Sequence, residues 1–250
     1  MKLPDEQGLA PFATGFPPGR RWLFLAPHPD DEVFGPGATL TQASRNGVEI
    51  ALAVVTDGAA QGPAGVREGE ARAAARELGL AEPRFWRFAD RSLDAADRRL
   101  HARLAEALVE AAPEVVFVTS PVELHPDHRA LALALQRVLR RWSLLGLRRR
   151  QPAWVAAYAV GTVLRPNLLV SGGGGWDAKR RAGACYSSQL AFRPYDAAME
   201  ALGTWRCLTL TGCERAEALH VLPVRAVVRR SAAGWAARMG TPDGVRPVRG

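Results

Sequence analysis

Residues 21–35 read "RWLFLAPHPDDEVFG", and this stretch decides the fold class. Its first part, RWLFLA at 21–26, is a continuous apolar run, which is typical of a strand buried on both faces of a parallel sheet. The part that follows crowds one histidine, two aspartates and one glutamate into residues 28–32. Pro and Asp are common turn residues, so a solvated turn explains this cluster when it is taken alone. A second cluster, ELHPDHRA at 123–130, repeats the combination, and two such clusters are harder to explain as turns.

Further apolar runs alternate with helical patterns along the chain. Expected strands cover 48–56, 83–88 and 114–120, and expected helices cover 36–46, 67–80, about 93–112 and the segment from the HPDH motif to about 141. This alternation predicts right-handed crossovers. The expected fold class is therefore α/β, with a Rossmann-like, mostly parallel sheet covered by helices on both faces, in a single domain. The glycine run SGGGG at 171–175 lacks the spacing of a phosphate loop, and we expect it to be a mobile connection.

Composition limits the partners and the compartment. The formal net charge is +8, but the basic residues are dispersed and no recognition motif accompanies them, so we expect no nucleic-acid partner. Cys185, Cys207 and Cys213 are too few and too irregularly spaced for a disulfide framework and are expected to be free thiols in a reducing compartment. No signal peptide and no apolar run of about 18 residues is present, which predicts a cytoplasmic protein without a membrane span. Composition leaves a homo-oligomer open.

Both charged clusters follow core strands, and ligands of open α/β sheets collect beyond the carboxyl ends of strands. One pocket can therefore hold both clusters. Catalytic zinc usually takes three protein ligands and leaves one position for water. His28 and Asp31 supply a pair and His128 supplies a third ligand, whereas Asp30 and His125 stay uncommitted. The same ligand set also suits Fe(II), so the residues alone leave the metal open between zinc and iron.

The uncommitted residues suit a hydrolytic reaction. A carboxylate such as Asp30 can accept the proton of water, and an imidazole such as His125 can stabilise an oxyanion. Asp127 is placed to orient the imidazole of His125. A lone His-Pro-Asp is commonly a turn and a His-x-x-His at a helix start can be a solvated pair, but the two together favour a metal site.

These residues resemble the LmbE-like, or PIG-L, family of zinc-dependent N-acetylglucosamine deacetylases. The family signature has His-Pro-Asp-Asp-Glu after the first strand and a later His-Pro-Asp-His, and both stand here at 28–32 and 125–128. The resemblance extends to TDG at 56–58, to Arg67 and Glu70 in a helix that ends in Leu-Gly, and to YSSQ at 186–189. It divides the chain into an irregular arm (1–20), a deacetylase core (21–190) and a C-terminal elaboration of the same domain (191–250).

The resemblance implies a role for each matching residue. His28, Asp31 and His128 would hold zinc, Asp30 would be the general base, His125 the electrophile or acid, and Asp127 would tune His125. Arg67 matches a position that lines the substrate pocket, although an arginine on a helix surface explains it nearly as well. Glu32 is expected to bond nearby backbone, and His101 and His220 are expected to be structural or solvated.

The expected function is removal of the N-acetyl group from an N-acetylglucosamine-type conjugate, a small molecule, giving acetate and a free amine. Two alternatives stay open: a zinc hydrolase of another amide or ester, and a sugar- or nucleic-acid-binding protein without catalysis.

Overall fold

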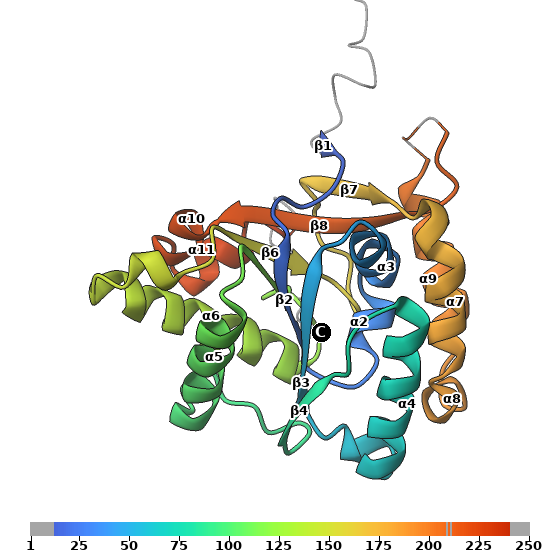
Figure 1. The fold of residues 1–250 in the computed structure, drawn as a ribbon, viewed down its shortest axis with the longest axis horizontal. Coiled ribbons are helices and arrows are strands. Elements are labelled where there is room, and N and C mark those ends of the chain that lie inside the picture. The colour runs from blue at the N-terminus through green and yellow to red at the C-terminus, as the bar shows by residue number, and fades with distance from the viewer. Residues whose placement is uncertain (1–12, 209, 211, 241–250) are drawn as a thin grey trace, which may run out of the picture.

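The chain folds around one eight-stranded sheet (Figure 1). The structure is a computed structural model and describes residues 13–208, 210 and 212–240. Within these residues the strands run in the order β1-β7-β8-β6-β5-β2-β3-β4, and only β8 is antiparallel to its neighbours. The prediction of an α/β fold with a mostly parallel sheet is therefore confirmed. The strands are β1 (Ala13–Thr14), β2 (Arg21–Ala26), β3 (Glu49–Thr56), β4 (Arg84–Phe88), β5 (Val115–Thr119), β6 (Trp154–Tyr158), β7 (Leu168–Ser171) and β8 (Ala216–Pro223).

Helices cover both faces of the sheet, and Figure 1 shows the two layers on either side of it. One layer consists of α5 (Arg98–Ala111), α6 (Pro126–Leu144), α10 (Val224–Val228) and α11 (Ala232–Ala236). The other consists of α2 (Asp31–Phe34), α3 (Gly37–Arg45), α4 (Ala64–Leu78), α7 (Trp176–Ala184), α8 (Ser187–Leu190) and α9 (Tyr195–Arg206). Short 3-10 turns are η1 (Ala59–Gln61), η2 (Arg148–Arg150) and η3 (Gly173–Gly175). Among the described residues, none of the helices has the length and apolarity that crossing a membrane requires.

The apolar side chains of β2 pack against the helical layers on both faces of the sheet. Leu23 and Leu25 belong to the core cluster shared with α5 and α6, whereas Trp22 and Phe24 belong to the cluster shared with α3. Successive side chains of a strand point to opposite faces, so only a strand without polar positions can be buried on both sides. Complete burial of each such side chain contributes about 1.5–3 kcal/mol.

The order of the strands creates a switch point between β2 and β5. From β2 the chain proceeds to β3 and β4 on one side, and it then returns to place β5 and β6 on the other side of β2. The loops that leave the carboxyl ends of β2 and β5 therefore diverge and leave a crevice between them, which is the usual ligand site of such sheets. Both charged clusters of the sequence lie on these two loops and in the first turns of the helices that follow them, α2 and α6.

Two expected elements differ from the structure. The helix expected from residue 93 begins only at Arg98, because the Asp94 side chain accepts a hydrogen bond from Ala96 N (2.8 Å) and Asp97 caps the helix through Arg99 N (2.7 Å). The glycine run 171–175 is not a loose connection. It ends β7, forms η3 and packs so closely on α3 that a Cβ on Gly175 would lie 2.3 Å from a backbone oxygen of that helix.

The chain beyond residue 190 contributes to the sheet itself. β8 is inserted between β6 and β7 and pairs with both strands in antiparallel register. At the other end of the chain, Ala13 and Thr14 of the expected irregular arm pair with β7. The remaining parts of the two expected terminal segments, 1–12 and 241–250, lie outside the described residues.

Candidate metal centre

The two charged clusters meet at the switch point. His28 lies in the loop after β2 and Asp31 begins α2, while His125 is the N-cap of α6 and His128 lies in its first turn. Asp30, between the ligand candidates of the first loop, has φ +132°, which residues with a side chain rarely adopt. Backbone strain of this kind concentrates at functional sites, where surrounding contacts hold it in place.

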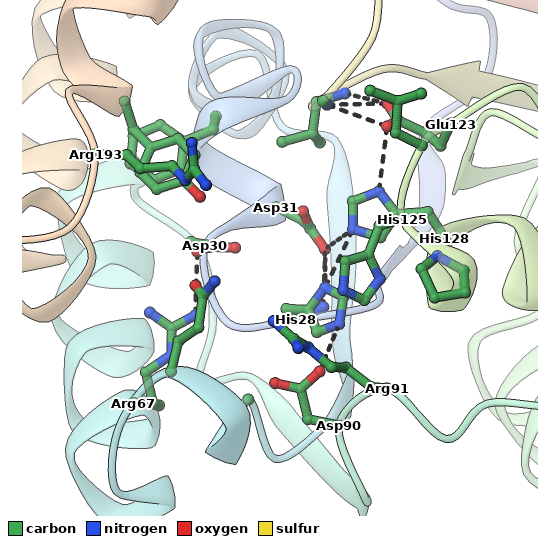
Figure 2. Close-up of a pocket in the computed structure, with 18 residues that line it drawn as sticks. His28, Asp30, Asp31, Arg67, Asp90, Arg91, Glu123, His125, His128 and Arg193 are labelled. Atoms are coloured by element: carbon green, nitrogen blue, oxygen red, sulfur yellow. Dashed lines mark hydrogen bonds and ion pairs between the residues drawn. The ribbon is translucent and has the colours of Figure 1, made fainter. Parts of the chain in front are cut away.

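Three side-chain atoms converge on one point (Figure 2). His28 Nδ1 lies 3.1 Å from His128 Nε2 and 3.4 Å from Asp31 Oδ2, and His128 Nε2 lies 3.3 Å from the same carboxylate oxygen. Ligand atoms of a tetrahedral zinc site, with bonds of about 2.0–2.1 Å, are separated by about 3.3–3.4 Å. The three atoms thus have the spacing of three metal ligands.

The far nitrogen of each of these imidazoles faces a carboxylate. His28 Nε2 lies 3.2 Å from Asp127 Oδ2 and 3.2 Å from Asp90 Oδ1. His128 Nδ1 lies 3.6 Å from Glu123 Oε2. A carboxylate in this position keeps the proton on the far nitrogen and leaves the near nitrogen free to bind a metal. This tautomer follows from the contacts on both rings.

The electrostatics of the site favour positive charge at the point of convergence. Burial lowers the pKa of His28, but hydrogen bonds to Asp127, Asp31 and Asp90 outweigh it and leave that pKa well above its usual value. Burial also opposes the charge of His128, yet mainly Asp31 raises the pKa of His128 to about 9. Although burial acts to raise it, the pKa of Asp31 is lowered by the two imidazoles. A divalent cation satisfies the same carboxylates, so the residues fit a metal ion.

Arg67 and Asp30 form a buried pair beside these ligands. Arg67 Nη2 lies 3.1 Å from Asp30 Oδ2 and also donates to the carbonyl of Pro29. Arg67 is only 2% exposed, so the interpretation as an arginine on a helix surface is wrong. Burial and the neighbouring Asp31 raise the pKa of Asp30 to about 6 against the opposing effect of Arg67. Gly58 makes room for this arrangement, because a Cβ there would lie 2.9 Å from Pro29 and 3.1 Å from Arg67 Nε.

His125 and Asp127 are arranged differently from what their spacing suggests. The Asp127 backbone N–H donates to His125 Nδ1 (3.2 Å), whereas the Asp127 carboxylate faces His28 and accepts from the N–H groups of Arg91 and Leu93. Burial and the neighbouring imidazoles lower the pKa of His125. A neutral His125 whose Nδ1 accepts a hydrogen bond carries its proton on Nε2. One nitrogen of His125 also lies within 4.8 Å of ligand atoms of His28 and His128. The atoms of His28, Asp31 and His128 lie within 3.1–3.4 Å of one another.

The site opens into a cavity of about 500 Å³. Its walls include residues that were not expected from the sequence, namely Asp90 after β4, Glu123 before α6, Arg193 between α8 and α9, and Tyr195 at the start of α9. Asp90 follows the carboxyl end of a strand and Glu123 stands two positions before His125. The rule that ligands collect beyond the carboxyl ends of strands could therefore have identified both residues. No such rule identifies Arg193 and Tyr195, because nothing in the sequence indicates that this later segment returns to the site.

Glu32 stabilises the loop that carries Asp30. It is fully buried, accepts from the Asp30 backbone N–H (3.2 Å), as the expected backbone role requires, and also accepts from the Tyr186 hydroxyl. Burial raises the pKa of Glu32 to about 8. Glu32 therefore holds Asp30 in place through its backbone and does not face the point of convergence.

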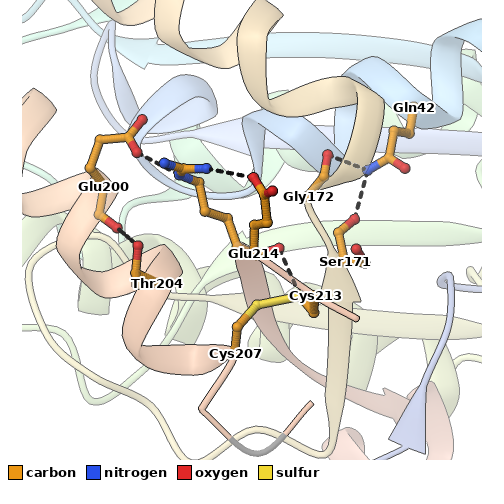
Figure 3. Close-up of a disulfide and its surroundings, with 9 residues drawn as sticks. Gln42, Ser171, Gly172, Glu200, Thr204, Cys207, Cys213 and Glu214 are labelled. Atoms are coloured by element: carbon orange, nitrogen blue, oxygen red, sulfur yellow. Dashed lines mark hydrogen bonds and ion pairs between the residues drawn. A yellow bond between two sulfur atoms is a disulfide. The ribbon is translucent and has the colours of Figure 1, made fainter. Parts of the chain in front are cut away.

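The cysteines and the other histidines lie outside the pocket. Cys207, at the end of α9, and Cys213 form a disulfide with Cα atoms 5.6 Å apart (Figure 3), and only Cys185 is free. The expectation of three free thiols is wrong for this pair, because the fold brings Cys207 and Cys213 within disulfide distance of each other. The cysteines therefore do not indicate a reducing compartment. His101 and His220 each bond a backbone carbonyl, as expected of structural histidines.

The fold and the site together define an α/β protein with a His/Asp site of metal-ligand spacing at its topological switch point. Residues 23–139 match the PIG-L family, described as GlcNAc-PI de-N-acetylase. The resemblance to the PIG-L, or LmbE-like, family seen in the sequence is therefore confirmed for this part of the chain.

Relatives with assigned names are deacetylases. A probable N-acetyl-alpha-D-glucosaminyl L-malate deacetylase 2 of Bacillus cereus is 29% identical over 136 residues, covering 49% of this chain and 62% of the relative. A 1D-myo-inositol 2-acetamido-2-deoxy-alpha-D-glucopyranoside deacetylase of Mycobacterium avium is 31% identical over 142 residues, covering 43% of this chain and 47% of the relative. The chain thus spans only part of the length of these relatives.

A solved structure supports the fold. The N,N'-diacetylchitobiose deacetylase of Pyrococcus horikoshii, complexed with its inhibitor MPG, superposes with a TM-score of 0.69 over 82% of this chain and 85% of its own. Its sequence identity is 22%, so this likeness concerns the architecture alone.

Proposed function

We propose that this protein is a zinc-dependent deacetylase that hydrolyses the acetamido group of an N-acetylglucosamine-type conjugate. The observation that carries the proposal is the convergence of His28 Nδ1, Asp31 Oδ2 and His128 Nε2 within 3.1–3.4 Å of one another, inside the matched family region. The names of the relatives supply the substrate class, because each names a conjugate of an N-acetylated glucosamine.

His28, Asp31 and His128 would hold the metal. When bound, zinc lowers the pKa of a water molecule toward about 7 and polarises a carbonyl oxygen. Fe(II) suits the same donor set, so the choice of zinc rests on the absence of a redox change in hydrolysis. The carboxylates behind the two imidazoles, Asp127 and Glu123, would fix their tautomers and orientation.

Asp30 would act as the general base. Its carboxylate lies at the pocket wall next to Asp31, and the ion pair with Arg67 holds it in one orientation. It accepts one proton from the attacking water while the new C–O bond forms at the acetamide carbon. The strained backbone at Asp30 and its bond to Glu32 keep the carboxylate in this position before substrate binds.

His125 would act as the electrophile, a hydrogen-bond donor to the substrate. Because Nδ1 accepts the Asp127 N–H, the Nε2–H group is the one available to the substrate. It donates a hydrogen bond to the developing oxyanion, and the proton that Asp30 took from the water passes to the leaving nitrogen as the C–N bond breaks, which gives acetate and a free amine. Arg67 and Asp90 line the same cavity and would bind polar groups of the sugar. The cavity of about 500 Å³ has the size of typical small-molecule sites.

The test combines metal analysis with acetate release from a panel of N-acetylglucosamine conjugates. We expect about one zinc per chain, acetate release that a chelator abolishes, and recovery on adding zinc back. Loading with Fe(II) instead decides between the two metals. Release of an acyl group or alcohol only from other amides or esters would establish the first alternative function. A protein that takes up no metal under any loading condition would refute the proposal, and binding of sugar without turnover would favour a binding protein.

A further inference from the structure

Two arginines of the pocket have no acidic partner. Arg91, in the loop after β4, and Arg193, between α8 and α9, both line the cavity and are exposed. Among the described residues, no carboxylate lies within 4.0 Å of either guanidinium group, in contrast to Arg67, which is buried against Asp30. Figure 2 shows the two side chains reaching the pocket from different walls, Arg193 from the C-terminal segment and Arg91 from the loop beside Asp90.

The carboxylates of the pocket are already engaged elsewhere. Asp31 and Asp90 contact the imidazole of His28, at 3.4 Å and 3.2 Å. Glu123 accepts from the backbone N–H groups of Val160 (2.6 Å) and Gly161 (3.1 Å). The negative charge therefore lies deep in the pocket, around the imidazoles, and the positive charge of Arg91 and Arg193 lies at its outer part without compensation.

An aromatic pair lies in the same pocket wall as Arg193. Phe34 and Tyr195 both line the cavity and stack on each other with ring centroids 5.2 Å apart. Tyr195 follows Arg193 by two residues, so one segment supplies both an aromatic surface and an unpaired guanidinium. The wall that carries Arg193 can therefore contact both an apolar and an anionic part of a ligand.

We propose that the natural substrate carries an anionic group, a carboxylate or a phosphate, on the part joined to the amino sugar, and that Arg91 and Arg193 bind this group. The inference rests on the proposed deacetylase function and names its substrate class. Guanidinium groups bind carboxylates and phosphates through paired, charge-assisted hydrogen bonds, and an unpaired arginine in a pocket wall has these donors available. The exposed position of both residues lets the anion enter without the desolvation that a buried ion pair requires.

The experiment compares four probes on the zinc-loaded enzyme. They are N-acetylglucosamine 1-phosphate, the N-acetylglucosamine glycoside of glycolic acid, the methyl ester of that glycoside, and methyl N-acetylglucosaminide. We expect kcat/KM for at least one anionic probe to exceed that for the neutral probes by about tenfold or more, mainly through a lower KM. The glycolate and its methyl ester differ only in the charge, and the phosphate probe distinguishes the two anions.

Variants connect the preference to the two arginines. In Arg91→Gln/Arg193→Gln the ratio of anionic to neutral kcat/KM should fall toward one, and in Arg193→Glu the ratio should fall below that of Arg193→Gln. Arg137→Gln, on the exposed surface of α6 away from the pocket, is the matched control and should keep the wild-type ratio. The wild-type preference should also shrink with added salt.

Two results would overturn the inference: a wild-type enzyme that turns over neutral and anionic probes equally well, or a preference that survives in the double variant. Calorimetric binding of the deacetylated glycolate glycoside keeps this test separate from the proposed function. If no probe releases acetate, the deacetylase proposal fails. Binding of that amine more tightly than its methyl ester, lost in the double variant, would then still support the anion site, and equal binding would refute it.

Discussion

Replacing Glu217 by alanine should destabilise the fold more than any change of a surface carboxylate. Glu217 lies on β8 and is 1% exposed. Its carboxylate accepts hydrogen bonds from Ala38 N (2.9 Å), Thr39 N (2.7 Å) and the Thr39 hydroxyl (2.6 Å) at the first turn of α3, and it pairs with Lys179 Nζ at 2.5 Å. One side chain thus joins the antiparallel strand to two helices of the layer that carries Asp31.

The magnitude follows from what the substitution leaves behind. Removing one partner of a buried ion pair costs about 3–5 kcal/mol, because the other charge stays buried without compensation. The two N–H groups at the start of α3 lose their acceptor, at about 1 kcal/mol each if water does not replace it. Burial lowers the pKa of Lys179 and Glu217 opposes that shift, so loss of Glu217 lowers this pKa further and limits the cost. We expect about 4–6 kcal/mol in total, or a fall in Tm of roughly 10–20 °C for a chain of this size.

Urea unfolding followed by circular dichroism measures this loss in the zinc-free protein. Glu214→Ala is the matched control, because Glu214 is exposed and has a single ion pair, with Arg215 at 3.3 Å, so its loss should cost less than about 0.5 kcal/mol. Lys179→Met combined with Glu217→Leu should recover part of the stability, since buried pairs are often replaceable by apolar groups. A Glu217→Ala variant within about 1 kcal/mol of Glu214→Ala would refute the reasoning.

Three further predictions concern the base, the glycine run and acid stability. Asp30→Asn should keep zinc but release acetate at least about 100-fold more slowly, measured by metal analysis and initial rates. Gly175→Ala should lower the free energy of unfolding by about 2 kcal/mol or more, because its Cβ would meet the backbone of α3, whereas Gly174→Ala has no contact closer than 3.7 Å and should cost less than about 1 kcal/mol. Hydrogen bonds, first of all from Arg180, lower the pKa of Glu200 from 4.5 to about 2, so Glu200 contributes stability above pH 4.5 that is lost as the pH falls toward 2. Glu200→Gln should flatten this part of the pH profile by up to about 1 kcal/mol, since the site is partly exposed.

Each of these predictions has a result that contradicts it. Near-normal turnover of Asp30→Asn would remove Asp30 from the role of base. Equal stability of the Gly175 and Gly174 variants would mean that η3 does not pack on α3 as described. If Glu200→Gln unfolds in acid along the wild-type curve, the hydrogen bonds to Glu200 contribute nothing measurable.

The sequence predicts the parts of the fold that depend on residues close together in the chain. The apolar runs at 21–26, 48–56 and 114–120 all became strands at or within two residues of the expected bounds. Such runs need only neighbouring residues to be recognised, because a strand buried on both faces is apolar at every position. The expected start of α5 was too early, because Leu93 fits the helical apolar pattern. The bonds of Asp94 and Asp97 to nearby N–H groups instead delay the first helical turn to Arg98.

One general rule predicts which residues of the site come together. Parallel strands end at the same edge of a sheet, so two motifs that each follow a core strand are brought together there, as His28 and His128 are at 3.1 Å. The rule places residues at an edge but not the direction of their side chains. For this reason the Asp127 carboxylate was expected at His125, and it lies instead against His28.

The sequence by itself determined the α/β class, the central strands and the two motifs that supply the ligand candidates, because these depend on residues close together in the chain. Only the tertiary structure decided that β8 runs antiparallel inside the sheet, that Cys207 pairs with Cys213, and that Arg193 lines the pocket. These are single residues or one strand without a local pattern, and their positions depend on how the chain returns after residue 190. Contacts between distant segments arise from the packing of the whole domain, which no short stretch of sequence encodes.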